Sequence, residues 1–149
     1  MTIKKIAAIA SILILSIGLI NCKKTVSDSN LRELGDKMYK YYDEYFRSIE
    51  ENLSNPEAAI KAGEDYINRM TPELKGFGEK FGKVYYKRSQ EYIMKEIKQK
   101  ISTRSSEAGS NIGRAFGLKR DLLAKFREQI MKLTQLMAKT RKRANTQTQ

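Results

Sequence analysis

The fold is decided by residues 28–54, which read DSNLRELGDKMYKYYDEYFRSIEENLS. Apolar residues recur in this stretch at steps of three and four, which places them on one face of an α-helix. Asp28 or Ser29 can cap the start of this helix, and we expect it to end near Ser54. The apolar positions are Leu31, Leu34, Met38, Tyr41 or Tyr42, Tyr45, Ile49 and Leu53. An amphipathic helix of this kind must pack against other helices to bury its apolar face.

Three further amphipathic segments follow this helix. Residues 55–57 (Asn-Pro-Glu) and 71–73 (Thr-Pro-Glu) each offer a cap, a proline at the first helical position and an acid in the first turn. They predict the starts of a second and a third helix. Residues 102–111 concentrate Ser, Thr, Gly and Asn, which predicts a break before a fourth helix over 112–137.

The absence of sustained two-residue alternation predicts an all-α fold. We expect an antiparallel bundle of about four helices in up-down-up-down order. Because the second and fourth helices differ in expected length, either a two-helix arm projects from the bundle or one long helix is broken. The expected division of the chain is a signal peptide at 1–21, a tether at 22–28, the bundle at 29–143 and a disordered tail at 144–149, with fading of the fourth helix from Lys139 onward.

The N-terminus has the order of segments found in export signals. Lys4 and Lys5 precede about fifteen mostly apolar residues, 6–20, which are too few for the roughly 20 that span a bilayer. The following polar residue and Cys22 match the cleavage region of a signal peptide. Cys22 is the only cysteine, so the chain cannot form an internal disulfide.

The four residues Leu19, Ile20, Asn21 and Cys22 resemble the lipobox of bacterial lipoproteins, and Asn before the cysteine resembles the relaxed lipoboxes of spirochaetes. The resemblance implies cleavage between Asn21 and Cys22, diacylglycerol on the Cys22 sulfur and acylation of the new amine. Several acyl chains would attach the protein stably to a membrane. It therefore implies a lipid-anchored protein of the cell envelope, with the outer membrane favoured. An uncleaved anchor or a free thiol is the alternative.

Charge is distributed unevenly along the chain, whose formal net charge is +12. Residues 28–73 carry eleven acids and six bases, whereas residues 74–149 carry nineteen bases and six acids. The acidic half cannot cancel the basic half, so a surplus of bases must face solvent or a partner. The candidate polyanion-binding residues lie toward the C-terminus: Arg114, Lys119, Arg120, Lys125, Arg127, Lys132, Lys139, Arg141, Lys142 and Arg143.

Two interpretations of these bases remain open. They form an ordinary solvated surface, or they capture a polyanion such as lipopolysaccharide, an anionic lipid or a glycosaminoglycan. Nucleic acid would satisfy the same electrostatic argument, but an envelope location argues against it.

The aromatic residues Tyr39, Tyr41, Tyr42, Tyr45 and Phe46 crowd the first helix. A helix with a single buried stripe cannot bury all five, so we expect some to be exposed or to lie at helix boundaries. Exposed tyrosines are typical of protein interfaces, which gives an alternative hypothesis of an assembly subunit that contacts another envelope protein. Packing in the core is the competing interpretation.

The composition argues against catalysis. The chain has no histidine, so it lacks the commonest general base at neutral pH and the commonest transition-metal ligand. Phosphate-binding glycine loops, calcium loops and nucleophile elbows are also missing from the sequence. We therefore expect a binding or structural module with no enzymatic activity, no cofactor and no metal site.

Overall fold

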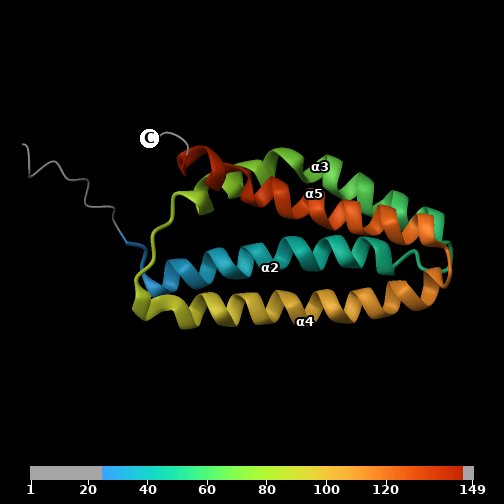
Figure 1. Cartoon of the computed structure of the whole chain (residues 1–149), viewed down its shortest axis with the longest axis horizontal. Coiled ribbons are helices and arrows are strands. Elements are labelled where there is room, and N and C mark those ends of the chain that lie inside the picture. Colours follow the sequence, from blue (N-terminus) through green and yellow to red (C-terminus); the bar gives the residue numbers. More distant parts are fainter. Residues whose placement is uncertain (1–24, 146–149) are drawn as a thin grey trace, which may run out of the picture.

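The computed structural model describes residues 25–145, with side chains up to Ala138, as a bundle of four long α-helices (Figure 1). They are α2 (Asp28–Glu50), α3 (Pro56–Gly82), α4 (Glu91–Phe116) and α5 (Arg120–Asn145), with a 3-10 turn η1 (Arg88–Gln90) before α4. The predicted all-α class and the number of helices are confirmed. The predicted signal peptide, Cys22 and residues 146–149 lie outside the described residues.

Successive helices run in opposite directions, so α2 and α4 are parallel to each other, as are α3 and α5 (Figure 1). The closest packing joins α3 to α5 and α2 to α4, and α2 also packs against α3. The hairpin α2–α3 therefore lies against the hairpin α4–α5. Several pairs of residues that bond between the two hairpins lie 64 residues apart in sequence, as in the Asp36–Lys100 ion pair and the Asn68–Lys132 hydrogen bond.

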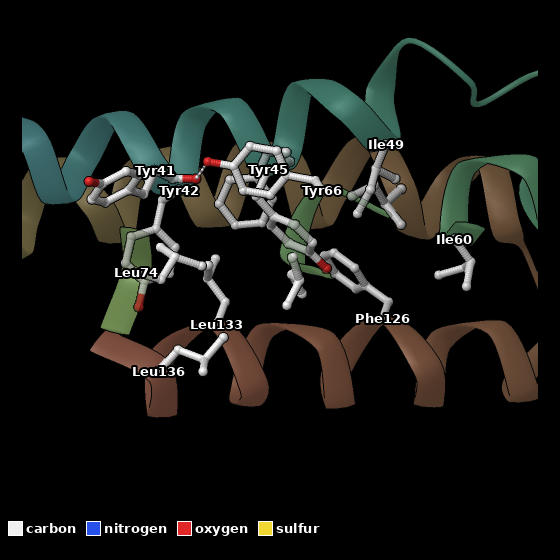
Figure 2. Close-up of a cluster of buried hydrophobic side chains, with 14 of the residues drawn as sticks. Tyr41, Tyr42, Tyr45, Ile49, Ile60, Tyr66, Leu74, Phe126, Leu133 and Leu136 are labelled. Atoms are coloured by element: carbon white, nitrogen blue, oxygen red, sulfur yellow. Dashed lines mark hydrogen bonds between the residues drawn. The ribbon is translucent and has the colours of Figure 1, made fainter. Parts of the chain in front are cut away.

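Helix α2 packs against α3 and α4, and its tyrosine side chains also reach α5. Tyr41, Tyr42, Tyr45 and Phe46 are all buried, with exposed fractions between 0 and 9% (Figure 2). Tyr39, the fifth aromatic residue of this stretch, is only half-buried, so α2 does not bury all five. Its buried face is nevertheless broad enough for four, because three helices contribute contacts to it. The contacts to their rings come from Phe77 on α3, Arg104 on α4 and Phe126 on α5.

Each buried tyrosine hydroxyl has a hydrogen-bond partner inside the bundle. Burial of an unpartnered hydroxyl would be costly, and these bonds offset that cost. The pairs are Tyr41 with Glu73 at 2.8 Å, Tyr42 with Thr134 at 2.9 Å, Tyr45 with Gln129 at 3.0 Å, and Tyr66 with Glu44 at 3.1 Å. Burial raises the pKa of all four phenols above the ordinary value. These tyrosines are core residues with satisfied polar tips.

Helix α3 continues through Thr71 and Pro72, where we predicted the start of a new helix. Ile60, Ile67 and Leu74 are spaced seven residues apart and all are buried, so the apolar face is continuous across the proline. The Thr71 hydroxyl donates to the Ile67 carbonyl at 2.7 Å. An interior proline costs about 3 kcal/mol, and burial of this face on both sides of it outweighs that cost.

Helix α4 likewise runs through residues 102–111, where we predicted a break. Ile97, Ala108 and Ile112 are buried on the same side of this helix. The gap in their apolar pattern is filled by Arg104, whose side chain is only 12% exposed. A charged residue in the buried stripe, together with several small residues, therefore produced the false prediction.

The connections between helices lie elsewhere, at residues 83–87 and 117–119. Gly117 ends α4 with a positive φ of 56°, a conformation that glycine adopts at little cost. Helix α5 therefore begins at Arg120, not at residue 112. It extends to Asn145, beyond Lys139 and two residues into the predicted tail.

The four helices have 23, 27, 26 and 26 residues, so within residues 25–145 neither a projecting arm nor a broken helix is present. Helix α2 ends at Glu50, and residues 51–54 form a turn. The Ser27 side chain caps the start of α2 by accepting from the Asn30 N–H, one residue before the predicted caps. The predicted cap of the second helix is confirmed, because the Asn55 side chain accepts from the Ala58 N–H at 3.2 Å.

Candidate functional site

The structure describes the side chains of six of the ten predicted polyanion-binding residues. All six are exposed on α4, α5 or the turn between them: Arg114, Lys119, Arg120, Lys125, Arg127 and Lys132. The other four, Lys139, Arg141, Lys142 and Arg143, lie where the structure describes only the helical backbone of α5. The geometry of the candidate site therefore concerns the first six.

Lys125 and Lys132 share one face of α5, as their seven-residue spacing predicts, and they line a groove between α3 and α5. The groove has a volume of about 590 Å³ and also contains one further lysine and three carboxylates: Lys61, Glu57, Glu64 and Glu128. The Lys132 ammonium donates to the Asn68 side-chain oxygen at 3.1 Å. Bases and acids are balanced in this groove, so it does not present a purely basic stripe.

Arg120 and Arg127 lie seven residues apart on a different face of α5. Within the part of the chain that the structure describes, neither of them nor Lys125 forms an ion pair. Lys119 is 3.8 Å from Glu57, and Arg114 donates to the Asn111 side chain at 2.8 Å. Of the described candidates, Arg120, Lys125 and Arg127 therefore have the least internal compensation.

Arg104 is a cation that sequence reasoning did not single out, and its role is internal. Its guanidinium is 2.7 Å from Asp43 and 2.6 Å from Glu50, and it lies over the ring of Phe46 at 5.4 Å. Hydrogen bonds from Arg104, and a further one from Asn111, hold the pKa of Glu50 below its usual value. Since α2 carboxylates take up its donors, Arg104 joins α4 to α2 and is not available to a ligand.

A second basic surface lies at the connection between α3 and α4. Residues 80–88 contain four bases and no acid. Lys83, Lys87 and Arg88 are exposed, and none of them forms an ion pair with another described residue. This surface was not predicted, because the bases of the C-terminal helix are more numerous and lie on one long element. The signal that could have found it is the run KVYYKR at 83–88.

The described chain begins beside this connection. Thr25 forms a bridge with Tyr85, and the Val26 N–H donates to the Tyr85 carbonyl at 2.9 Å. The residue that joins these segments is Gln90, a polar side chain only 4% exposed. Its amide nitrogen donates to the Val26 carbonyl at 3.0 Å and to Asp28 at 2.6 Å, and its oxygen accepts from the Lys87 N–H at 2.8 Å.

Among residues 25–145, no group of three or more His, Cys, Asp or Glu side chains is arranged to hold a metal ion. In the same part of the chain, no helix combines the length and the apolar character needed to cross a membrane. The chain matches no known family model, and no similar protein was found among curated sequences or solved structures.

Proposed function

We propose that the protein is a lipid-anchored lipoprotein of the cell envelope that acts as a binding module and captures polyanions through the bases of its second helical hairpin. The observation that carries this proposal is the exposure of Arg120, Lys125 and Arg127 without ion pairs among the described residues. These residues lie in the first two turns of α5, toward the end of the bundle away from Thr25 (Figure 1).

Electrostatics explains why such an arrangement favours an anionic partner. The first hairpin has a net negative charge, but several of its carboxylates already pair within their own helix or with α4, as in Asp36–Lys100 and Asp43–Arg104. The remaining bases of α5 create a positive potential that attracts polyanions and is screened by salt. Lipopolysaccharide phosphates, anionic lipids and sulfated glycosaminoglycans are the candidate ligands for a domain in the cell envelope.

The proposed anchor is a lipid on Cys22, and its support is the resemblance of residues 19–22 to a lipobox. Cells grown with a labelled fatty acid should incorporate the label into the native chain and not into the Cys22→Ser variant. Intact-mass analysis should also show loss of residues 1–21. An unmodified thiol on a chain that retains these residues would contradict the anchor.

The polyanion role is tested by retention on immobilised heparin as salt increases. Replacement of Arg120, Lys125 and Arg127 with Gln should lower the salt concentration at which the protein elutes, because three exposed bases that form no ion pair with a described residue are lost. The matched control replaces Lys37, Lys40 and Arg47 with Gln, which removes the same charge from bases of α2 that already pair with carboxylates. Equal shifts in the two variants would show that only net charge matters and would contradict a defined site on α5.

The alternative of an assembly subunit has less support. Four of the eight tyrosines, Tyr41, Tyr42, Tyr45 and Tyr66, are buried in the core and cannot contact an envelope protein. Salt-insensitive self-association of the protein in sedimentation would favour this alternative over electrostatic capture.

A further inference from the structure

The end of the bundle that receives the chain from the proposed anchor also carries a basic and aromatic surface. We call it the basal surface and define it as Lys83, Tyr85, Lys87 and Arg88. All four residues are exposed, and Tyr85 is 42% exposed. The basal surface belongs to the connection that follows α3, beside the start of α2 (Figure 1).

Backbone geometry places the proposed lipid attachment close to this surface. Thr25 and Val26 are held against Tyr85 by a bridge and a hydrogen bond, and Gln90 fixes Val26 from the other side. Cys22 precedes Thr25 by three residues, and an extended chain spans at most about 3.6 Å per residue. Thr25 therefore lies within about 11 Å of Cys22 along the chain, so an acylated Cys22 would hold the basal surface close to the lipid.

The charges of the basal surface are not explained by interactions inside the protein. Lys87 and Arg88 stand at the N-terminal side of η1 and α4, where the helix dipole disfavours cations. Glu79 and Glu91 only flank the run 80–88, and Asp28 accepts hydrogen bonds from Gln90 and Tyr92. An external anion would compensate these bases.

The chemistry of the surface fits a lipid interface. Lysine and arginine side chains near an anionic membrane are attracted to its headgroups, and tyrosine is enriched at the level of the headgroups. A basic and aromatic surface next to a lipid attachment point therefore has the composition that a membrane contact requires.

We propose that the basal surface docks on anionic phospholipid headgroups, so that the bundle stands upright on the membrane. This inference rests on the proposed anchoring through Cys22. Helix α4 has 26 residues, so its far end would lie about 39 Å above its start. The bases of early α5 would then face away from the membrane, where they can meet a polyanion from outside.

The orientation is tested on the lipidated full chain reconstituted in vesicles, with a fluorophore on one introduced cysteine. Ser89→Cys places the label beside the basal surface, and Leu118→Cys places it at the far end, on a side chain 96% exposed. A quencher on the lipid headgroups reports proximity to the membrane. In phosphatidylcholine vesicles with a minor share of phosphatidylglycerol, quenching should be several-fold stronger at position 89 than at position 118.

The charge requirement is tested with the same label at position 89. Each base near an anionic surface contributes about fivefold to partitioning, so loss of three should disfavour the docked state on the order of a hundredfold. Replacement of Lys83, Lys87 and Arg88 with Gln should therefore lower quenching in the mixed vesicles to the value in pure phosphatidylcholine. The control with Lys37, Lys40 and Arg47 of α2 replaced by Gln loses the same charge from bases that already pair with carboxylates, and it should be quenched like the native chain.

Equal quenching at positions 89 and 118 in the mixed vesicles would overturn the upright orientation. Equal quenching of the native chain at position 89 in mixed and pure phosphatidylcholine vesicles would overturn the requirement for anionic lipid. The intact mass of the same preparation reports separately on the anchor. A missing acyl mass contradicts the proposed function, whereas the quenching ratios decide the docking of the basal surface.

Discussion

Gln90 determines the geometry of one end of the bundle through a single side chain. It contacts the incoming chain at Val26, the start of α2 at Asp28 and the connection at Lys87. A primary amide suits this position because it both donates and accepts, so it can satisfy carbonyl, carboxylate and N–H groups together. The placement of the chain entry beside the basal surface depends on these bonds.

Gln90→Ala should lower the free energy of unfolding by about 2 kcal/mol, because it leaves partly buried polar groups without partners. Chemical denaturation measures the change. Gln99→Ala is the control, since the Gln99 side chain is exposed and makes no hydrogen bond to a described residue, and its effect should stay within about 0.5 kcal/mol. Equal losses in the two variants would contradict the role of Gln90.

Arg104 is the second residue whose loss should be costly. Arg104→Gln leaves Asp43 and Glu50, which are only 17% and 20% exposed, without their shared cation. Breaking such a pair typically costs about 3 kcal/mol. Arg47→Gln removes a cation that is 68% exposed and also pairs with Asp43, so it should cost at most about 1 kcal/mol. Denaturation curves of the two variants test this ranking.

The same pair predicts how stability depends on pH. Arg104 lowers the pKa of Glu50 in the folded chain below its ordinary value of 4.5. The unfolded chain then binds a proton before the folded chain does, so this contribution is complete above pH 4.5 and is lost as pH falls through the folded pKa. In Arg104→Gln the acid-dependent loss should be smaller. An unchanged slope of stability against pH would contradict the coupling.

At the scale of elements, the close packing of α3 against α5 depends on a glycine, which has no side chain. A Cβ added to Gly78 would lie 2.7 Å from the Leu136 carbonyl oxygen and 2.8 Å from that of Met137, both backbone atoms of α5. Glycine at this position therefore sets the close approach of α3 and α5. Gly109 and Gly113 on α4 have no such neighbour within 4 Å, so their regular spacing does not serve helix packing.

Gly78→Ala should destabilise the bundle by about 1–3 kcal/mol, because the backbone of α5 must move to admit the new methyl group. Gly109→Ala adds the same methyl group in open space in a helix interior and should stabilise by about 0.5–1 kcal/mol. Thermal or chemical unfolding of both variants measures the difference. A stabilising effect at position 78 would show that α3 and α5 are not packed this closely.

At the scale of the whole molecule, the buried tyrosines predict resistance of the folded chain to alkaline titration. Burial raises the pKa of Tyr41, Tyr42, Tyr45 and Tyr66 above the ordinary value of 10.0. Above pH 10 the unfolded chain loses these protons and the folded chain keeps them, so the free energy of unfolding falls as pH rises. Absorbance of tyrosinate should show four phenols that ionise only when the bundle unfolds. Titration of these four phenols in the folded chain would contradict the arrangement of the core.

The sequence by itself determined the all-α class, the four amphipathic segments, the cap at Asn55 and the surplus of bases, because each depends on neighbours within a few residues. It placed two boundaries wrongly at Pro72 and at residues 102–111, since local breakers are outweighed by burial that only the folded chain provides. Tertiary structure alone decided that the aromatic residues of α2 meet side chains from three other helices and that the Arg104 side chain is only 12% exposed. It also placed the basal surface beside Thr25 and Val26, where the described chain begins. The physical reason is that residues that pair between helices can lie 64 positions apart, and such pairs produce no periodic pattern in the sequence. Which helices become neighbours therefore depends on the complementarity of their shapes and charges in three dimensions.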